Sequence, residues 1–248
     1  MTSTPSIGTA GWNIPKCHVG QFPGDGSHLA RYAGRFTAVE INSSFYRPHR
    51  PATYARWAAS VPPEFRFAVK LPREISHGRK LVGSEECLER FLGEVETLGD
   101  RLGPILVQLP PSFRYGEAIV AGFLEALRAR YHGNVVCEPR HPSWFADDVD
   151  ALLSRFQVAR VAADPAVIPR AARPGGWPGL VYRRLHGSPR VYYSAYAPEY
   201  IEATARAMRE ESAKQGWCIF DNTADGAAAK DALGLLKRLE VSSEFGHG

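Results

Sequence analysis

The residues of this chain best suited to chemistry are charged side chains at the ends of short β-rich runs. They comprise carboxylates, basic groups and histidines: Glu40, Glu138, Asp164, Lys70, Arg140, Arg184, His77 and His186. Opposite charges in one place move the pKa values of neighbouring groups apart, so that one group acts as an acid and another as a base. The set therefore predicts general acid/base chemistry on a small polar metabolite.

Five of these residues are the expected catalytic groups. Glu40 and Glu138 are the acid/base candidates, because strands that are not neighbours can face each other across a shared interior. Lys70 and His186 are expected to transfer protons or to stabilise charge, and Asp164 to orient a histidine. Burial lowers the pKa of a lysine toward nucleophilic or basic use, although an ion pair with Glu40 or Glu138 is the alternative reading of Lys70.

A second group of residues is expected to bind the substrate. Arg140 and Arg184 present planar forks that match a phosphate or a carboxylate. Amide groups would orient the ligand, and aromatic rings suit a sugar-like molecule. The remaining expected binding residues are Trp12, Asn42, Tyr46, His77, Gln108, Trp144, Tyr193, Tyr196 and Asn222. The sequence thus favours an anionic or sugar-like ligand.

Other functions stay open at this point. Facing carboxylates among aromatic rings also fit glycosidase-type hydrolysis. Histidines and carboxylates would suit a metal-dependent hydrolase or isomerase, but no HExxH motif is present, and no cofactor is predicted beyond that divalent metal. The chain also has neither a GxSxG elbow nor a P-loop. A protein that binds a metabolite or a nucleic acid without catalysis is the remaining alternative.

The elements that must position these residues are eight β-rich runs separated mostly by helical patterns. The runs lie at 6–10, 38–44, 66–71, 104–109, 134–139, 159–164, 180–186 and 217–222. Apolar residues with helical spacing occupy 51–61, 85–102, 117–131, 147–156, 199–214 and 227–239. The link at 165–179 holds four prolines and three glycines, which predicts a non-helical connection from strand six to strand seven.

Strands that alternate with helices without a change in composition favour a parallel sheet. Eight such units in 248 residues fit an α/β fold in which residues 1–248 form a single TIM (β/α)8 barrel. Residues two apart in a strand face the same side, which pairs Glu40 with Asn42 and Arg184 with His186. The polar strand ends are therefore expected to meet at the carboxyl end of the barrel.

Composition limits the partners and the location. Charged residues make up 23% of the chain and the net charge is +4, without the concentrated basic stripe of a nucleic-acid-binding protein. The four cysteines form no CxxC pair, so neither a disulfide framework nor a zinc knuckle is expected. No apolar run is long enough to span a bilayer, and no secretory signal is visible. These features predict a cytoplasmic protein without a membrane partner, and they leave its oligomeric state undetermined.

Several motifs together resemble one known family. They are GTAGW (8–12), VEINSSFY (39–46), FAVKLPREISH (67–77), LVQLPPSF (106–113), CEPRHPSWF (137–145), RLHG (184–187) and FDNT (220–223). The chain is similar over nearly its full length to the YecE-like family of bacterial TIM barrels, a domain of unknown function. The resemblance implies the barrel fold and supplies no activity. Position 221 is Asp where such proteins often have Asn, and Asp221 is expected to point away from Asn222, into the barrel wall or helix layer.

Overall fold

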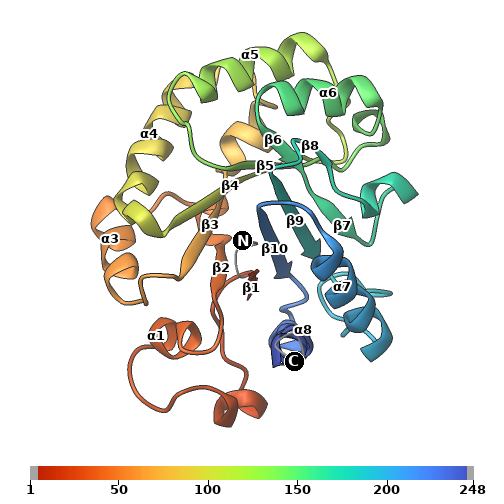
Figure 1. Ribbon diagram of the computed structural model, residues 1–248. Helices are drawn as coiled ribbons and strands as arrows, with labels where there is room; N and C mark the ends of the chain where they lie inside the picture. The colour runs from red at the N-terminus through yellow and green to blue at the C-terminus, as the bar shows by residue number, and fades with distance from the viewer. Residues whose placement is uncertain (1–4, 245–248) are drawn as a thin grey trace.

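The computed structural model describes residues 5–244, and their side chains up to residue 240. Strands occupy its centre and helices surround them (Figure 1). The strands are β1 (Ser6–Thr9), β2 (Ala38–Ile41), β3 (Arg66–Lys70), β4 (Leu102–Gln108), β5 (Val135–Glu138), β6 (Val158–Arg160), β7 (Ala162–Asp164), β8 (Gly175–Gly176), β9 (Leu180–Leu185) and β10 (Gln215–Phe220). The longer helices are α3 (Pro51–Ala59), α4 (Glu85–Val95), α5 (Glu117–Arg128), α6 (Asp147–Arg155), α7 (Pro198–Glu210) and α8 (Ala227–Glu244).

The eight expected strands and six expected helices are present in the expected order, with shifted ends. The second strand stops at Ile41, because Ser43–Tyr46 form the short helix α2. The sixth is divided at Val161 into β6 and β7. The second half of the helix expected at 85–102 is a 3-10 turn, Glu96–Arg101. Short helical segments that were not predicted include 3-10 turns at Lys16–Gln21 and Pro142–Trp144, the helix α1 (His28–Ala33) and a π-turn at Glu74–Gly78.

The strands are hydrogen-bonded in two sheets. One has the order β1-β10-β9-β7 and the other β2-β3-β4-β5-β6-β8, with every pair parallel except β6 with β8. The sheets meet at an isolated parallel bridge between Ala10 and Glu40. They also meet along 158–164, where β6 pairs with β5 and β7 pairs with β9. The α/β class and the parallel sheets are confirmed, whereas these ladders do not close a continuous hydrogen-bonded barrel.

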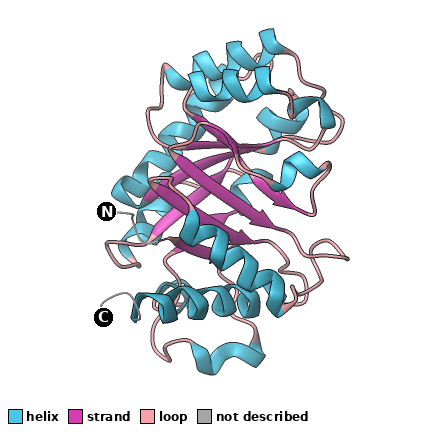
Figure 2. Cartoon of the chain, turned by 45° about the vertical axis from the view of Figure 1, so that its right-hand side comes forward, coloured by secondary structure: helices cyan, strands magenta, loops and turns pink. Residues whose placement is uncertain are grey.

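The two sheets nevertheless share one apolar interior, which we call the inner cluster. It contains apolar side chains from both sheets, among them Ala38, Ala68, Leu106, Val136, Ala159, Ala163, Tyr182, Trp217 and Ile219. Tyr182 stacks on Trp217 with ring centroids 5.7 Å apart. Helices pack around the strands (Figure 2). A second, larger cluster of apolar side chains lies between the sheets and the helices. Both faces of most strands are therefore buried, as in a parallel sheet covered by helices.

The link at 165–179 contains no α-helix, as predicted. Its regular structure is one 3-10 turn, Pro169–Ala172, and the two-residue strand β8 against β6. Cys137 and Cys218 are free and buried in strands, as expected of small apolar side chains. Among the residues that the structure describes, no helix is both long and apolar enough to cross a membrane.

Candidate functional site

Arg184 stands at the centre of the polar contacts in the interior. Its Nε donates to Glu40 Oε2 at 3.0 Å and its Nη2 to Glu40 Oε1 at 2.7 Å, a bidentate pair. Its Nη1 donates to Glu138 Oε2 at 2.6 Å, and its Nη2 also reaches Asp221 Oδ2 at 2.9 Å. Arg184 is only 1% exposed. One buried guanidinium thus joins carboxylates from β2, from β5 and from the residue after β10.

His186 lies two residues after Arg184, on the same side of the strand. Its Nδ1 is 3.0 Å from Asp221 Oδ2 and its Nε2 is 2.9 Å from Glu138 Oε1. Ionised carboxylates only accept hydrogen bonds, so a proton on either ring nitrogen has a partner. Asp221, His186 and Glu138 therefore form a hydrogen-bonded line across the carboxyl end of the interior.

Two further groups complete this arrangement. Tyr182 donates its hydroxyl to Glu40 at 2.8 Å. Arg140 Nη2 lies 2.5 Å from Glu138 Oε1 and also contacts His186 Nε2. We call Glu40, Glu138, Arg140, Arg184, His186 and Asp221 the charged cluster. Since Glu40, Glu138, Arg140, Arg184 and His186 were all expected in the pocket, sequence analysis identified most of it.

Opposite charges dominate the ionisation of the buried carboxylates. Burial alone would raise the pKa of Glu138, but Arg184, followed by Arg140, holds it well below the usual 4.5. The pKa of Asp221 is likewise lowered, because Arg184 and His186 outweigh the effect of burial. The same carboxylates raise the pKa of Arg184 against its own desolvation. The carboxylates of Glu138 and Asp221 are thus ionised and held by cations at neutral pH.

Lys70 ends β3 and faces the interior beside this cluster. Burial, followed by repulsion from Arg184, lowers its pKa from 10.5 to about 8, although Glu40 and Glu138 act in the opposite direction. Its Nζ lies 4.1 Å from the centre of the Phe45 ring. The ion pair considered for Lys70 is not formed: within the described part of the chain, no carboxylate is in contact with its amine.

Several polar atoms at this end of the interior lack a protein partner. Asn42 Oδ1 and Arg140 Nε are buried, and neither has a hydrogen-bond partner among the described residues. Gln108 pairs in register with Glu138 and so faces the same side. The ring of His77 packs edge-on against Phe45 at 4.9 Å, and burial, then Lys70, lower the pKa of His77. His77 Nδ1 is also 3.0 Å from the Ser76 hydroxyl, so Asn42 Oδ1 and Arg140 Nε are the two atoms of this group that have unused hydrogen-bonding capacity.

For the last strand, the sequence predicted that Asn222 faces the interior and Asp221 does not, and this prediction was wrong. Trp217 and Ile219 point into the interior, so Asp221 does too, whereas Asn222 points the other way. Asn222 donates to Asp231 at 2.7 Å and to the backbone oxygen of Ser194 at 2.9 Å. Both faces of β10 are apolar, so the sequence pattern does not show which face is inside. Asp221 replaces Asn222 in the site.

Asp164 and Trp144 are also outside the site, contrary to expectation. Asp164 lies on the outer face of β7, since Ala163 is the residue paired with Arg184, and its Oδ1 accepts the Tyr196 hydroxyl at 2.8 Å. That contact also places Tyr196 in the outer layer. Trp144 is 1% exposed and donates its Nε1 to the backbone oxygen of Phe113 at 2.9 Å, which makes it a core residue.

The aromatic residues expected to bind substrate do not form one platform. Trp12 packs edge-on against Trp57 at 5.0 Å, and Tyr46 is 79% exposed. Tyr193 lies under the guanidinium of Arg190, 3.7 Å from its ring centre. Its neighbour Tyr192, which sequence analysis missed, instead packs edge-on against His186 at 5.9 Å. The φ of +69° at Tyr192 turns its ring toward the charged cluster, and no sequence signal indicates such a turn.

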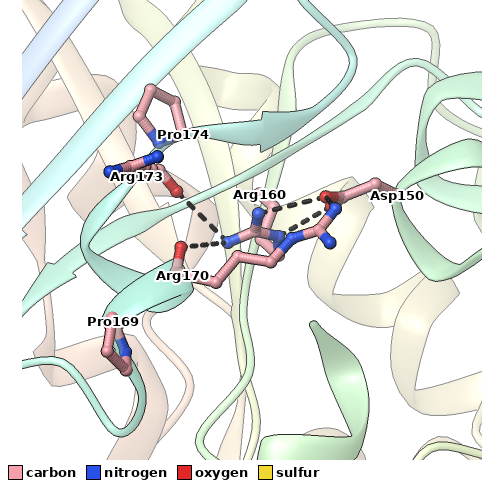
Figure 3. Close-up of a pocket in the computed structure, with 6 residues that line it drawn as sticks. All are labelled: Asp150, Arg160, Pro169, Arg170, Arg173 and Pro174. Atoms are coloured by element: carbon pink, nitrogen blue, oxygen red, sulfur yellow. Dashed lines mark hydrogen bonds and ion pairs between the residues drawn. The ribbon is translucent and has the colours of Figure 1, made fainter. Parts of the chain in front are cut away.

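A separate cavity of about 450 Å³ lies outside the sheets, beside the link at 165–179 (Figure 3). Arg160 forms one wall and donates to Asp150 at 2.7 and 3.1 Å and to the backbone oxygen of Arg173 at 3.2 Å. Arg170 also contacts Asp150, at 3.0 Å. Because these contacts satisfy Arg160 and join helix α6 to the link, we assign this group of residues a structural role.

Comparison with known proteins gives the same family that the sequence motifs indicate. Residues 6–245 match the family described as protein of unknown function DUF72. The UPF0759 protein YecE of Escherichia coli K12 is 31% identical over 175 residues, which cover 68% of this chain. The match spans 61% of the length of that relative.

Solved structures give the same family. A DUF72 family protein from Thermotoga maritima superposes with a TM-score of 0.77 at 26% identity, over 96% of this chain and all of that chain (100%). Another, from Enterococcus faecalis, gives a TM-score of 0.79 at 23% identity, over 96% of each chain. This chain belongs to the DUF72 family of proteins of unknown function.

Proposed function

We propose that this chain is an enzyme that performs general acid/base chemistry on a small metabolite carrying an anionic group. The observation that carries the proposal is the line from Asp221 through His186 to Glu138, beside a lysine whose pKa is about 8. Groups that titrate near neutral pH and are held in place by hydrogen bonds are the usual acids and bases of enzymes.

Each group has a distinct role in this proposal. His186 moves the proton, because it is the one member of the line whose ring accepts and donates in turn. Asp221 fixes the orientation of the ring through Nδ1. Glu138 accepts from Nε2 and is kept ionised by Arg184 and Arg140. Lys70 supplies a second proton-transfer group from the opposite sheet.

A buried donor supports an anionic ligand. Among the described residues Arg140 Nε has no hydrogen-bond partner, although Nη2 of the same side chain already binds Glu138. Arg73 adds positive charge at the rim, since it contributes to the lowered pKa of His77. A carboxylate or phosphate at Arg140 would satisfy that atom.

We further propose that the two sheets form one eight-stranded barrel with the site at its carboxyl end. The inner cluster draws side chains from both sheets, and Gly11 donates its amide to the Glu40 backbone oxygen at 2.9 Å across one seam. Sites of enzymes with this fold lie at the carboxyl ends of the strands, where Glu138, His186 and Asp221 are found.

Exchange of substrate protons with deuterium tests the proposal. Two- to six-carbon oxo acids, hydroxy acids and sugar phosphates are incubated with the protein in D2O, and loss of a proton signal is followed by NMR. We expect exchange on one chemical class and a decrease of about 10²-fold or more in His186→Gln. Arg90→Gln, on an exposed ion pair far from the interior, is the matched control. No exchange with any class, or equal exchange in His186→Gln, would contradict the proposal.

A further inference from the structure

The amine of Lys70 is placed as a nucleophile rather than as an ion-pair partner. The strand β3 ends at Lys70, and the side chain of Lys70 lies on the inner face, two residues after Ala68 and at the carboxyl end of the strand. Its Nζ rests over the Phe45 ring, 4.1 Å from the centre, which is a weak and easily exchanged contact. The amine is close enough to the charged cluster for Arg184, Glu40, Glu138 and Asp221 all to act on it.

Two of the carboxylates that act on Lys70, those of Glu40 and Glu138, are already bound by other side chains. Both oxygens of Glu40 bind Arg184, and one also accepts from Tyr182. Both oxygens of Glu138 are also bound, by Arg184 and by His186. Burial therefore acts on an amine without a bound counter-ion, which favours its neutral and nucleophilic form.

We propose that Lys70 forms a covalent imine with a carbonyl substrate that carries a carboxylate or a phosphate near its carbonyl group. The inference rests on the proposed function, because it uses the same interior, and it names the substrate class that this site accepts. Arg140 would bind the anionic group through its free Nε, and Lys70 would attack the carbonyl carbon from β3.

The step balances with groups that the site contains. The neutral amine forms a C–N bond to the carbonyl carbon, and one proton moves from the nitrogen to the carbonyl oxygen to give a neutral carbinolamine. One further proton, added to the hydroxyl group, lets it leave as water, which breaks the C–O bond and leaves the protonated imine. His186, held between Asp221 and Glu138, relays the first proton, supplies the second and recovers it on hydrolysis. No oxidant or reductant is required.

The protonated imine is an electron sink, which explains why acid/base groups surround Lys70. It makes a C–H bond of the carbon next to the imine carbon more acidic, so that a base can remove that proton while the electron pair moves toward the nitrogen. His186 or Glu138 would act on that proton. The site thus combines a nucleophile and a proton-transfer group, a pairing used with carbonyl substrates.

Borohydride trapping tests this inference on the intact protein. The chain is incubated with pyruvate, with dihydroxyacetone phosphate or with uncharged dihydroxyacetone, then reduced and mapped by peptide mass spectrometry. The chain has only six lysines, which makes the assignment direct. We expect a reduced adduct on the Lys70 peptide with one anionic probe, on the order of tenfold above any other lysine. Pyruvate and dihydroxyacetone phosphate separate a carboxylate from a phosphate as the recognised group.

Variants distinguish the inference from the proposed function. Lys70→Arg keeps the positive charge but cannot form the imine, and we expect it to lose the adduct while the D2O exchange also falls. Lys230→Met, an exposed lysine on α8, should leave both unchanged. D2O exchange that survives in Lys70→Arg, without an adduct in the wild-type protein, would overturn the imine and retain the acid/base site. Adducts spread evenly over all lysines would also overturn it.

Discussion

At the scale of single residues, Arg184 decides the arrangement of the site. Glu40 comes from β2, Glu138 from β5 and Asp221 follows β10, and each has an oxygen within 3.0 Å of one guanidinium. Buried ions are costly unless they are paired and hydrogen-bonded. The four side chains therefore stabilise one another. Replacement of one of them leaves a buried charge without its partner.

Replacement of Arg184 tests this dependence. Arg184→Met leaves the buried carboxylates of Glu40 and Glu138 without their main cation, and we expect it to reduce the free energy of unfolding by about 3–5 kcal/mol. Urea denaturation measures the effect. The matched control is Arg90→Gln, whose ion pair with Glu74 is exposed and should contribute less than about 1 kcal/mol. Equal losses in both variants would contradict the central role of Arg184.

Lys70 gives a prediction with a defined pH dependence. Its pKa is about 8 in the folded protein against 10.5 in the unfolded chain, so the unfolded state holds more protons between these values and stability rises with pH there. Below pH 8 the lysine is protonated in both states, so the loss of stability that its burial causes no longer changes with pH. We expect Lys70→Met to be more stable than the wild-type protein at pH 7 by up to about 3 kcal/mol.

The stability advantage of Lys70→Met over the wild-type protein should shrink from pH 8 upward. It should vanish near and above pH 10.5, where the lysine is largely neutral in both states. Urea denaturation of both proteins at several pH values gives the difference directly, and Lys230→Met controls for loss of an exposed lysine. A Lys70→Met variant that is less stable at pH 7, or a difference independent of pH, would show that the amine is not penalised by burial.

At the scale of elements, strand parity explains which site residues were predictable. Glu40, Lys70, Glu138 and Arg184 follow inward-facing residues at the ends of strands whose limits were nearly right. The predicted direction of the side chains was wrong where a strand is apolar on both faces, as in β10. Such a strand does not show which face is inside, and a shift of one residue moves every side chain to the other face. Asp221 and Asn222 changed places for this reason.

The link at 165–179 is held in place by contacts with β6 and α6, so it is not free to close over the charged cluster. Arg160 at the end of β6 binds Asp150 on α6 and two backbone oxygens of the link, while the Gly176 amide donates to Asp150 at 3.1 Å. Gly175 lies so close to Arg160 that a Cβ there would sit 2.2 Å from its Nη2. The link therefore packs on a buried ion pair.

Asp150→Asn should release this link. It leaves the buried guanidinium of Arg160 without its carboxylate, and we expect a loss of about 3 kcal/mol in the free energy of unfolding with faster proteolysis within 165–179. The control is Asp147→Asn, whose carboxylate binds Arg170 but is 92% exposed, and which should change stability by less than about 1 kcal/mol. Unchanged proteolysis in Asp150→Asn would show that the ion pair does not hold the link.

At the scale of the whole molecule, the two sheets should behave as one cooperative unit, because their side chains share the inner cluster. Amide hydrogen exchange tests this at the seams. The Gly11 amide bonds to the Glu40 backbone oxygen at 2.9 Å at one seam, and the Val161 amide, between β6 and β7, bonds to the Cys137 backbone oxygen at 2.9 Å at the other.

We expect both amides to exchange only by global unfolding, at the slowest rate in the protein. The Val82 amide, in a surface turn, serves as the fast-exchanging control. Exchange at one seam that is much faster than in the centre of β4 or β9 would show that the sheets open separately and that the barrel is not closed.

The α/β class, the order of the strands and helices, the non-helical link and most of the charged cluster were predictable from the amino-acid sequence. These follow from local patterns: periodicity, turn residues and polar residues at strand ends. Packing in three dimensions brings Asp221 and Tyr192 to the charged cluster, directs Asp164, Trp144 and Asn222 away from it, and leaves Lys70 without an ion pair among the described residues. These outcomes were not predictable because they depend on register between strands and on competition for one guanidinium, both of which arise between residues far apart in the chain.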